Sequence, residues 1–106
     1  MSEQRERVPI GVQANAWDAA TTGAGGTSSA LDTRCAPFVT AFGNSSGATT
    51  ITIQVSQDNS NWYDSQSTQV LSGSGNFCIH ATVAARFVRL KSSASVTATA
   101  TISAKD

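Results

Sequence analysis

A two-residue alternation of apolar and polar side chains constrains the fold of this chain more than any other feature of its sequence. The pattern is clearest in residues 96–103, VTATATIS, where small apolar residues alternate with threonine or serine. Successive side chains of a β-strand point to opposite faces of the sheet, so this segment predicts a strand with one buried and one solvated face. Its β-branched residues also favour a strand over a helix.

Similar alternation recurs along the chain, in residues 49–56, 77–83 and 85–92, with turns rich in Gly, Asn and Ser between the segments. Residues 15–20, NAWDAA, are the one stretch that suits a helical turn, and they are too few to form a stable helix alone. The sequence shows no helical period and no internal repeat. We therefore expect an all-β protein, an antiparallel β-sandwich or jelly roll.

The N-terminal part of the chain has a different composition. Four of the charged residues lie within residues 1–7, and residues 21–29, TTGAGGTSS, are typical of a flexible loop. We expect residues 1–29 to form an extended arm and a loop, and residues 30–106 to form the β-sandwich domain. The arm is either a frayed terminus or a segment that docks on a neighbouring subunit.

The charge of the chain argues against several classes of partner. Charged residues make up 13% of the sequence, and the seven basic and seven acidic side chains cancel. Such a chain lacks the basic surface that nucleic acids and anionic membranes attract, so we expect neither as a partner. The opening segment MSEQRER is not followed by an apolar run, which predicts synthesis in a cytoplasm without a secretory signal.

The sequence offers little for catalysis or metal binding. Cys35 and Cys78 are expected to be reduced and part of the core, with a disulfide as the alternative. Cys78 and His80 share one face of an expected strand, but no orienting acid accompanies them. Two cysteines and one histidine do not complete a four-ligand zinc site. We expect no enzymatic activity, no metal and no cofactor.

The polar turn SQDNSNWYDS, residues 56–65, contains the most suggestive side chains. Asp58 and its asparagine neighbours have the chemistry of a hairpin connection, which leads into the adjacent aromatic residues Trp62 and Tyr63. A Trp directly after a turn most often packs over the end of a sheet. Two other roles stay open, a contact between subunits and a stacking surface for a sugar ring in which Asp58, Trp62 and Tyr63 bind the ligand.

Two segments carry a family resemblance. VSQDNSNW, residues 55–62, resembles the SxDGxxW hairpin of discoidin-like domains, and ARFVRL, residues 85–90, is similar to their ARYVRL strand. Asn59 replaces the usual Gly, and the N-terminal loops that hold the ligand in that family are missing. The resemblance therefore implies a galactose-binding-like jelly-roll architecture and not sugar binding.

A second resemblance covers more of the chain. Residues 37–65 and 75–105, with the SQDNSNWY hairpin and the VRLKS strand, resemble short Ser/Thr/Ala-rich β-sandwich proteins from the structural gene clusters of tailed phages. This resemblance implies a virion protein, and more specifically a capsid decoration or cement protein located on the capsid surface. Its implied partners are the major capsid protein and further copies of itself, as a homotrimer. The alternative is a small carbohydrate-binding module or a tail-fibre adhesin domain.

The expected contacts with capsid or neighbouring subunits involve basic and aromatic residues. Arg5 and Arg7 lie in the charged arm, and Phe87 and Arg89 alternate with buried positions in the strand over residues 85–92. An outward phenylalanine between basic residues is unusual and marks either an interface or a second apolar layer. We expect these four residues to lie at a capsid or subunit contact.

Overall fold

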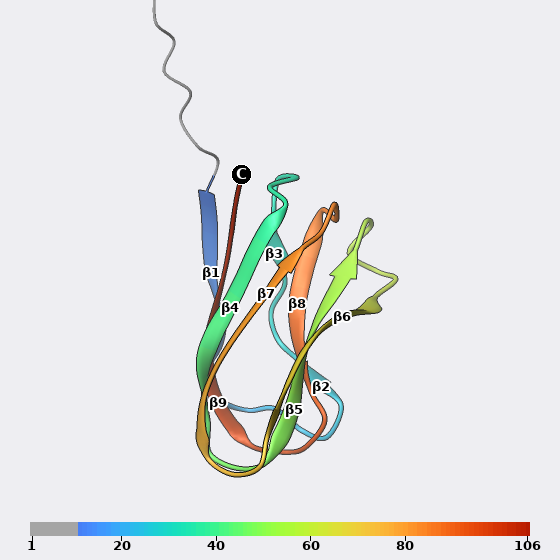
Figure 1. Cartoon of the computed structure of the whole chain (residues 1–106). Coiled ribbons are helices and arrows are strands. Elements are labelled where there is room, and N and C mark those ends of the chain that lie inside the picture. The colour runs from blue at the N-terminus through green and yellow to red at the C-terminus, as the bar shows by residue number, and fades with distance from the viewer. Residues whose placement is uncertain (1–10) are drawn as a thin grey trace, which may run out of the picture.

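The computed structural model describes residues 11–106, which form nine β-strands and no helix (Figure 1). The strands are β1 (Gly11–Thr21), β2 (Gly26–Thr27), β3 (Leu31–Asp32), β4 (Phe38–Ser45), β5 (Thr49–Ser56), β6 (Tyr63–Leu71), β7 (Gly75–Thr82), β8 (Phe87–Ser92) and β9 (Thr97–Lys105). The described residues include no helix long and apolar enough to cross a membrane. Residues 1–7, with Arg5 and Arg7, lie outside the described part of the chain.

The strands make two antiparallel sheets that lie face to face (Figure 1). The first sheet has the strand order β1-β9-β4-β7, and the second has the order β2-β8-β5-β6, with β3 also paired to β8. Every strand pair is antiparallel. The expected all-β antiparallel sandwich is confirmed.

Alternating side chains of both sheets form the core between them. The small residues Ala98, Ala100 and Ala104 of β9 are buried, whereas the threonines between them point outward. The bulk of the core comes from larger side chains that are less than 2% exposed: Ile51, Ile53, Leu90, Ile102, Val39 and Val88. Apolar burial of this kind supplies most of the free energy that stabilises a small domain.

Glycine at position 43 lets β4 and β9 approach each other closely. Gly43 pairs with Ala100, and a Cβ at this position would collide with the carbonyl oxygen of Thr99. The strand therefore continues through this residue to Ser45, although Gly usually weakens a strand interior.

The expected boundary between an arm and a domain at residue 30 is wrong. Strand β1 pairs with β9 from Gly11↔Lys105 to Thr21↔Thr97 and is part of the sandwich. Bulges disturb the register of β1 on both sides of Trp17, which explains why residues 15–20 suit a helical turn in the sequence although they form part of a strand. Ala16 and Trp17 are both 5% exposed, so two consecutive residues are buried and the two-residue alternation is lost there.

Both cysteines are free, as expected, but the expectation that they belong to the core is wrong. Cys78 lies on the outward side of β7, opposite Phe42 of β4. Cys35 lies in the turn before β4, with a positive φ of 65°. Neither position lies between the two sheets.

The burial of Trp17 predicts a large effect of its removal. We expect Trp17→Ala to lower the free energy of unfolding by about 3–5 kcal/mol, because the substitution removes a large core side chain from β1. Urea unfolding followed by circular dichroism measures this loss. A loss below about 1 kcal/mol would show that β1 is dispensable for the sandwich and that residue 30 does mark the start of the domain.

Candidate functional site

The turn between β5 and β6 is built around the carboxylate of Asp58. Its Oδ1 accepts hydrogen bonds from the backbone N–H groups of Ser60 and Asn61, at 2.9 and 2.8 Å, and its Oδ2 accepts one from Asn61 Nδ2 at 2.8 Å. These donors hold the pKa of Asp58 far below its ordinary value. Asn59 has a positive φ of 61°, a conformation that Asn tolerates better than most residues other than Gly. Asp58 therefore shapes the turn and stays ionised.

Trp62 packs on the outside of the second sheet. The guanidinium carbon of Arg89 lies 4.1 Å from the centroid of the Trp62 ring, a cation–π contact. Arg89 Nε also donates to Gln54 Oε1 at 2.8 Å, and Gln54 Nε2 donates to Asp64 Oδ1 at 2.7 Å. Lys91 Nζ lies 3.7 Å from Asp64 Oδ2. The tryptophan thus fastens the hairpin to the sheet, and this outer face satisfies its own charges.

Tyr63 points to the opposite side of β6 from Trp62. It is 66% exposed and lines a shallow pocket of about 260 Å³ together with Val55 and Ala85. The two neighbouring aromatic rings therefore do not form one surface, as the alternation along a strand requires. The structure brings Asp58 and Tyr63 to one pocket and leaves Trp62 outside it.

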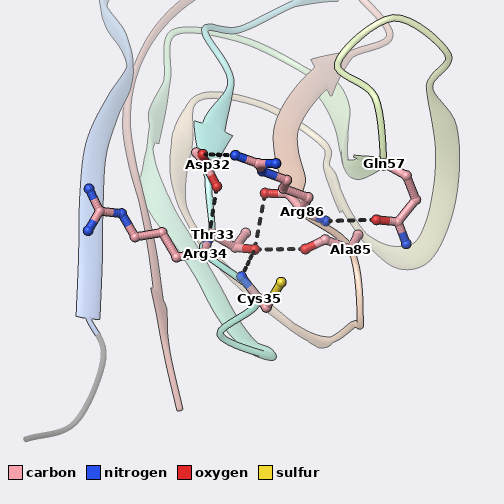
Figure 2. A network of polar contacts seen from close by, with 7 residues as sticks. All are labelled: Asp32, Thr33, Arg34, Cys35, Gln57, Ala85 and Arg86. Carbon is pink, nitrogen blue, oxygen red and sulfur yellow. Dashed lines mark hydrogen bonds and ion pairs between the residues drawn. The ribbon is translucent and has the colours of Figure 1, made fainter.

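A fully buried threonine connects the loops next to this pocket (Figure 2). Thr33 Oγ1 donates to the carbonyl oxygen of Ala85 at 2.7 Å and accepts from the backbone N–H of Cys35 at 3.2 Å. Gln57 reaches the same loop, because its Oε1 accepts from the N–H of Arg86 at 3.3 Å and its Nε2 donates to the carbonyl oxygen of Ala84 at 3.0 Å. Three loops are thereby joined at one end of the sandwich.

Arg86 and Phe87 continue this network toward the outer face of the second sheet. Arg86 Nη2 lies 3.4 Å from Asp32 Oδ2, and its guanidinium carbon lies 5.3 Å from the centroid of the Phe87 ring. The backbone N–H of Arg34, and then the Arg86 guanidinium, hold the pKa of Asp32 below its ordinary value. Phe87 and Arg89 point outward as the alternation predicts, and both have partners within the chain.

The outer face of the first sheet has the opposite character. Phe38 and Phe42 of β4 are 52% and 48% exposed and project from the same side of their strand. We call this surface the aromatic face. It consists of these two residues, Thr40 between them on β4, and their neighbours across on β7 and β9: Cys78, His80, Thr82, Thr101, Ser103 and Lys105. Lys105 is its one charged residue, so the face is nearly neutral and partly apolar. The sequence predicts a strand for residues 36–42, APFVTAF, but it does not indicate which side of that strand faces the core.

The described residues contain no group of three or more His, Cys, Asp or Glu side chains that could hold a metal ion. Cys78 and His80 share the outward side of β7, as expected. They supply two donor atoms, which is fewer than a structural zinc site requires.

The fold of this chain is similar to that of a solved structure, although sequence comparisons find no relative. No known protein family matches the sequence, and no curated protein matches it. The crystal structure of the SPBc2 prophage-derived protein YomS superimposes with a TM-score of 0.71, over 98% of this chain and 100% of that one, at 14% sequence identity. This chain shares its fold with a prophage-derived protein. At that identity the likeness concerns the fold alone.

A second solved structure, PirA, covers the same shares of both chains at 13% identity. Its TM-score of 0.49 is too low to carry an argument, so the comparison rests on the prophage-derived protein.

The loop network predicts that the hydroxyl of Thr33 contributes strongly to stability. We expect Thr33→Val to lower the free energy of unfolding by about 1–3 kcal/mol, because it leaves buried backbone groups without their partner. Urea unfolding measures the loss, with the exposed Thr97→Val as the matched control. Equal effects of the two substitutions would show that the hydroxyl network does not hold the loops.

Proposed function

We propose that this chain is a non-enzymatic structural protein of a phage virion, and more specifically a capsid decoration protein. In this role it binds the outer surface of the head through the major capsid protein and stabilises the junctions between capsid subunits. The fold shared with a prophage-derived protein supports the phage origin. The observation that carries the structural role is the aromatic face, which is available for a protein partner.

The physical argument concerns the exposed rings of Phe38 and Phe42. They lie four residues apart on one strand, and about half of each ring residue stays in contact with water. Two exposed phenylalanines on one side of a strand, with Thr40 between them, make this surface partly apolar, and exposed apolar patches mark interaction surfaces. Because the aromatic face has one charge and many hydroxyl groups, it suits a flat and nearly neutral protein surface better than nucleic acid.

Such a contact does not have to be strong in one copy. A homotrimer presents three aromatic faces at once, and binding of the second and third faces becomes effectively intramolecular. A repeating capsid lattice offers matching sites about its symmetry axes. Modest contacts then add up to stable occupancy, which is what a cement protein requires.

Phe87 and Arg89 are the other candidate capsid contacts among the described residues, and their side chains already have partners within the chain. Phe87 and Arg89 lie on the outer face of the second sheet, where Arg86 and Trp62 already contact them. For the carbohydrate-binding alternative, Asp58 and Tyr63 line one pocket, but Trp62 lies on the other side of the strand under Arg89, so the three residues do not form one stacking surface. We therefore place the principal capsid contact on the aromatic face.

The proposal predicts that the aromatic face can be disabled without unfolding the sandwich. We expect Phe38→Thr combined with Phe42→Thr to reduce binding to capsids that lack this protein by about tenfold or more, since the two rings anchor the contact. Co-sedimentation with such capsids measures the affinity. The matched control is Val70→Thr, which changes a residue that is 72% exposed on β6.

Binding that is equal for the double variant and the wild type would contradict the proposed role of the aromatic face. Light scattering on the purified protein tests the trimer separately. A monomeric mass at micromolar concentration would remove the multivalent part of the argument.

The charged N-terminal segment gives a further prediction. Deleting residues 1–7, with Arg5 and Arg7, is expected to abolish or strongly reduce capsid occupancy while the urea unfolding midpoint stays the same, since β1 begins at Gly11. Occupancy is measured by quantifying the protein on purified particles. Unchanged occupancy would show that the segment is not an anchor.

A further inference from the structure

A small pocket opens at the end of the sandwich, between the β5–β6 turn and the loop that connects β7 to β8. Its apolar part is formed by Val55 and Ala85, and the exposed ring of Tyr63 forms one wall. Asp58 and Asn61 lie at the polar side. The pocket is large enough for one side chain or one small ring.

Asp58 gives the pocket a permanent negative charge. It is the one charged residue among those that line the pocket, and no cationic side chain of residues 11–106 pairs with it. Its Oδ1 accepts two backbone N–H groups and the hydroxyl of Ser56, whereas its Oδ2 accepts Asn61 Nδ2 alone. A carboxylate oxygen has more than one acceptor position, so Oδ2 can still accept a bond from a ligand.

Arg86, which follows the lining residue Ala85 in sequence, does not neutralise this charge. Its guanidinium extends toward Asp32, and Gln57 lies on the other side of the Arg86 backbone (Figure 2). The pocket and the guanidinium therefore belong to opposite sides of the loop.

Three side-chain donors around the pocket are already directed at protein atoms. The amino groups of Gln57 and Asn61 point to Ala84 O and Asp58 Oδ2, and the hydroxyl of Ser56 points to Asp58 Oδ1. The lining groups that still have room for a ligand are the Asp58 carboxylate and the face and hydroxyl of the Tyr63 ring, so the pocket is acidic and aromatic. A sugar hydroxyl both donates and accepts, and an anion needs donors, whereas lysine and arginine side chains only donate.

We propose that this pocket receives a lysine or arginine side chain that projects from a protein partner. The cationic group lies against the Asp58 carboxylate and the Tyr63 ring, and the alkyl stem packs on Val55 and Ala85. Aromatic rings and carboxylates both attract such cations, and the stem of either residue is apolar enough for the remaining lining. The proposal adds a second contact to the proposed function and does not depend on the aromatic face.

The test uses the full chain and a small probe. We expect Nα-acetyl-arginine amide to shift the backbone amide signals of Gln57, Asn61 and Ala85 saturably in two-dimensional NMR, with a dissociation constant in roughly the millimolar range. Nα-acetyl-citrulline amide has nearly the same shape without the charge. It is expected to cause no saturable shift.

Variants then locate the site. Asp58→Asn and Tyr63→Leu are each expected to weaken binding of the arginine probe at least about fivefold. Asp64→Asn is the matched control, because it removes a carboxylate from the same hairpin but on the opposite face, where Gln54 and Lys91 contact it. If Asp58→Asn fails to fold, Tyr63→Leu decides, because that side chain is 66% exposed and contributes little to the core.

Three results would overturn the proposal: equal shifts with the citrulline probe, saturable shifts with methyl β-galactoside in place of the arginine probe, or probe binding that survives both pocket variants. The Phe38→Thr, Phe42→Thr variant separates this proposal from the proposed function. It is expected to keep the affinity for the arginine probe while it loses capsid binding.

Discussion

The close packing of β9 against its neighbours is the constraint on which the rest of the structure depends. Its buried side chains are mostly alanine, and Gly43 of β4 leaves no Cβ between the two strands. Alanine buries little surface, so one sheet alone provides too little apolar contact to offset the entropy of folding. The isoleucines of β5 and Leu90 of β8, on the second sheet, supply the missing volume, and Trp17 of β1 adds to the side of the first sheet. The core therefore needs both sheets, and β1 takes part in it through Ala16 and Trp17.

With the inner faces closed, the outer faces and the loop end are left for function, and they differ in one respect. On the second sheet, Arg89 has Trp62 and Gln54 as partners, so its charge and the ring are partly desolvated by each other. On the first sheet, Phe38 and Phe42 have threonine, cysteine and lysine across from them, which cover little of either ring. A face that is internally satisfied gains little from a partner. On a face with exposed rings, a partner that covers them removes apolar area from water, and the binding free energy becomes more favourable in proportion to that area.

The sequence is informative wherever the two-residue alternation is regular. The faces of β5, β7, β8 and β9 follow from it directly, including the outward positions of Phe87 and Arg89. It failed at β1, where bulges put Ala16 and Trp17 on the buried side together and imitate a helical pattern. The pocket could not be predicted from the sequence either. Ala85 and Thr33 come from two loops, and long-range hydrogen bonds set where these loops lie relative to the hairpin.

Those same hydrogen bonds fix the walls of the pocket that we propose as a binding site. Arg34 and Cys35 both have positive φ values, 54° and 65°, which L-residues other than glycine adopt at a cost. The buried Thr33 hydroxyl holds this conformation by linking the turn to the carbonyl oxygen of Ala85. Ala85 in turn lies in the pocket, and Gln57 fixes the hairpin beside it. The walls of the pocket are thus set before a ligand arrives, so binding does not have to provide the entropy of ordering the loops.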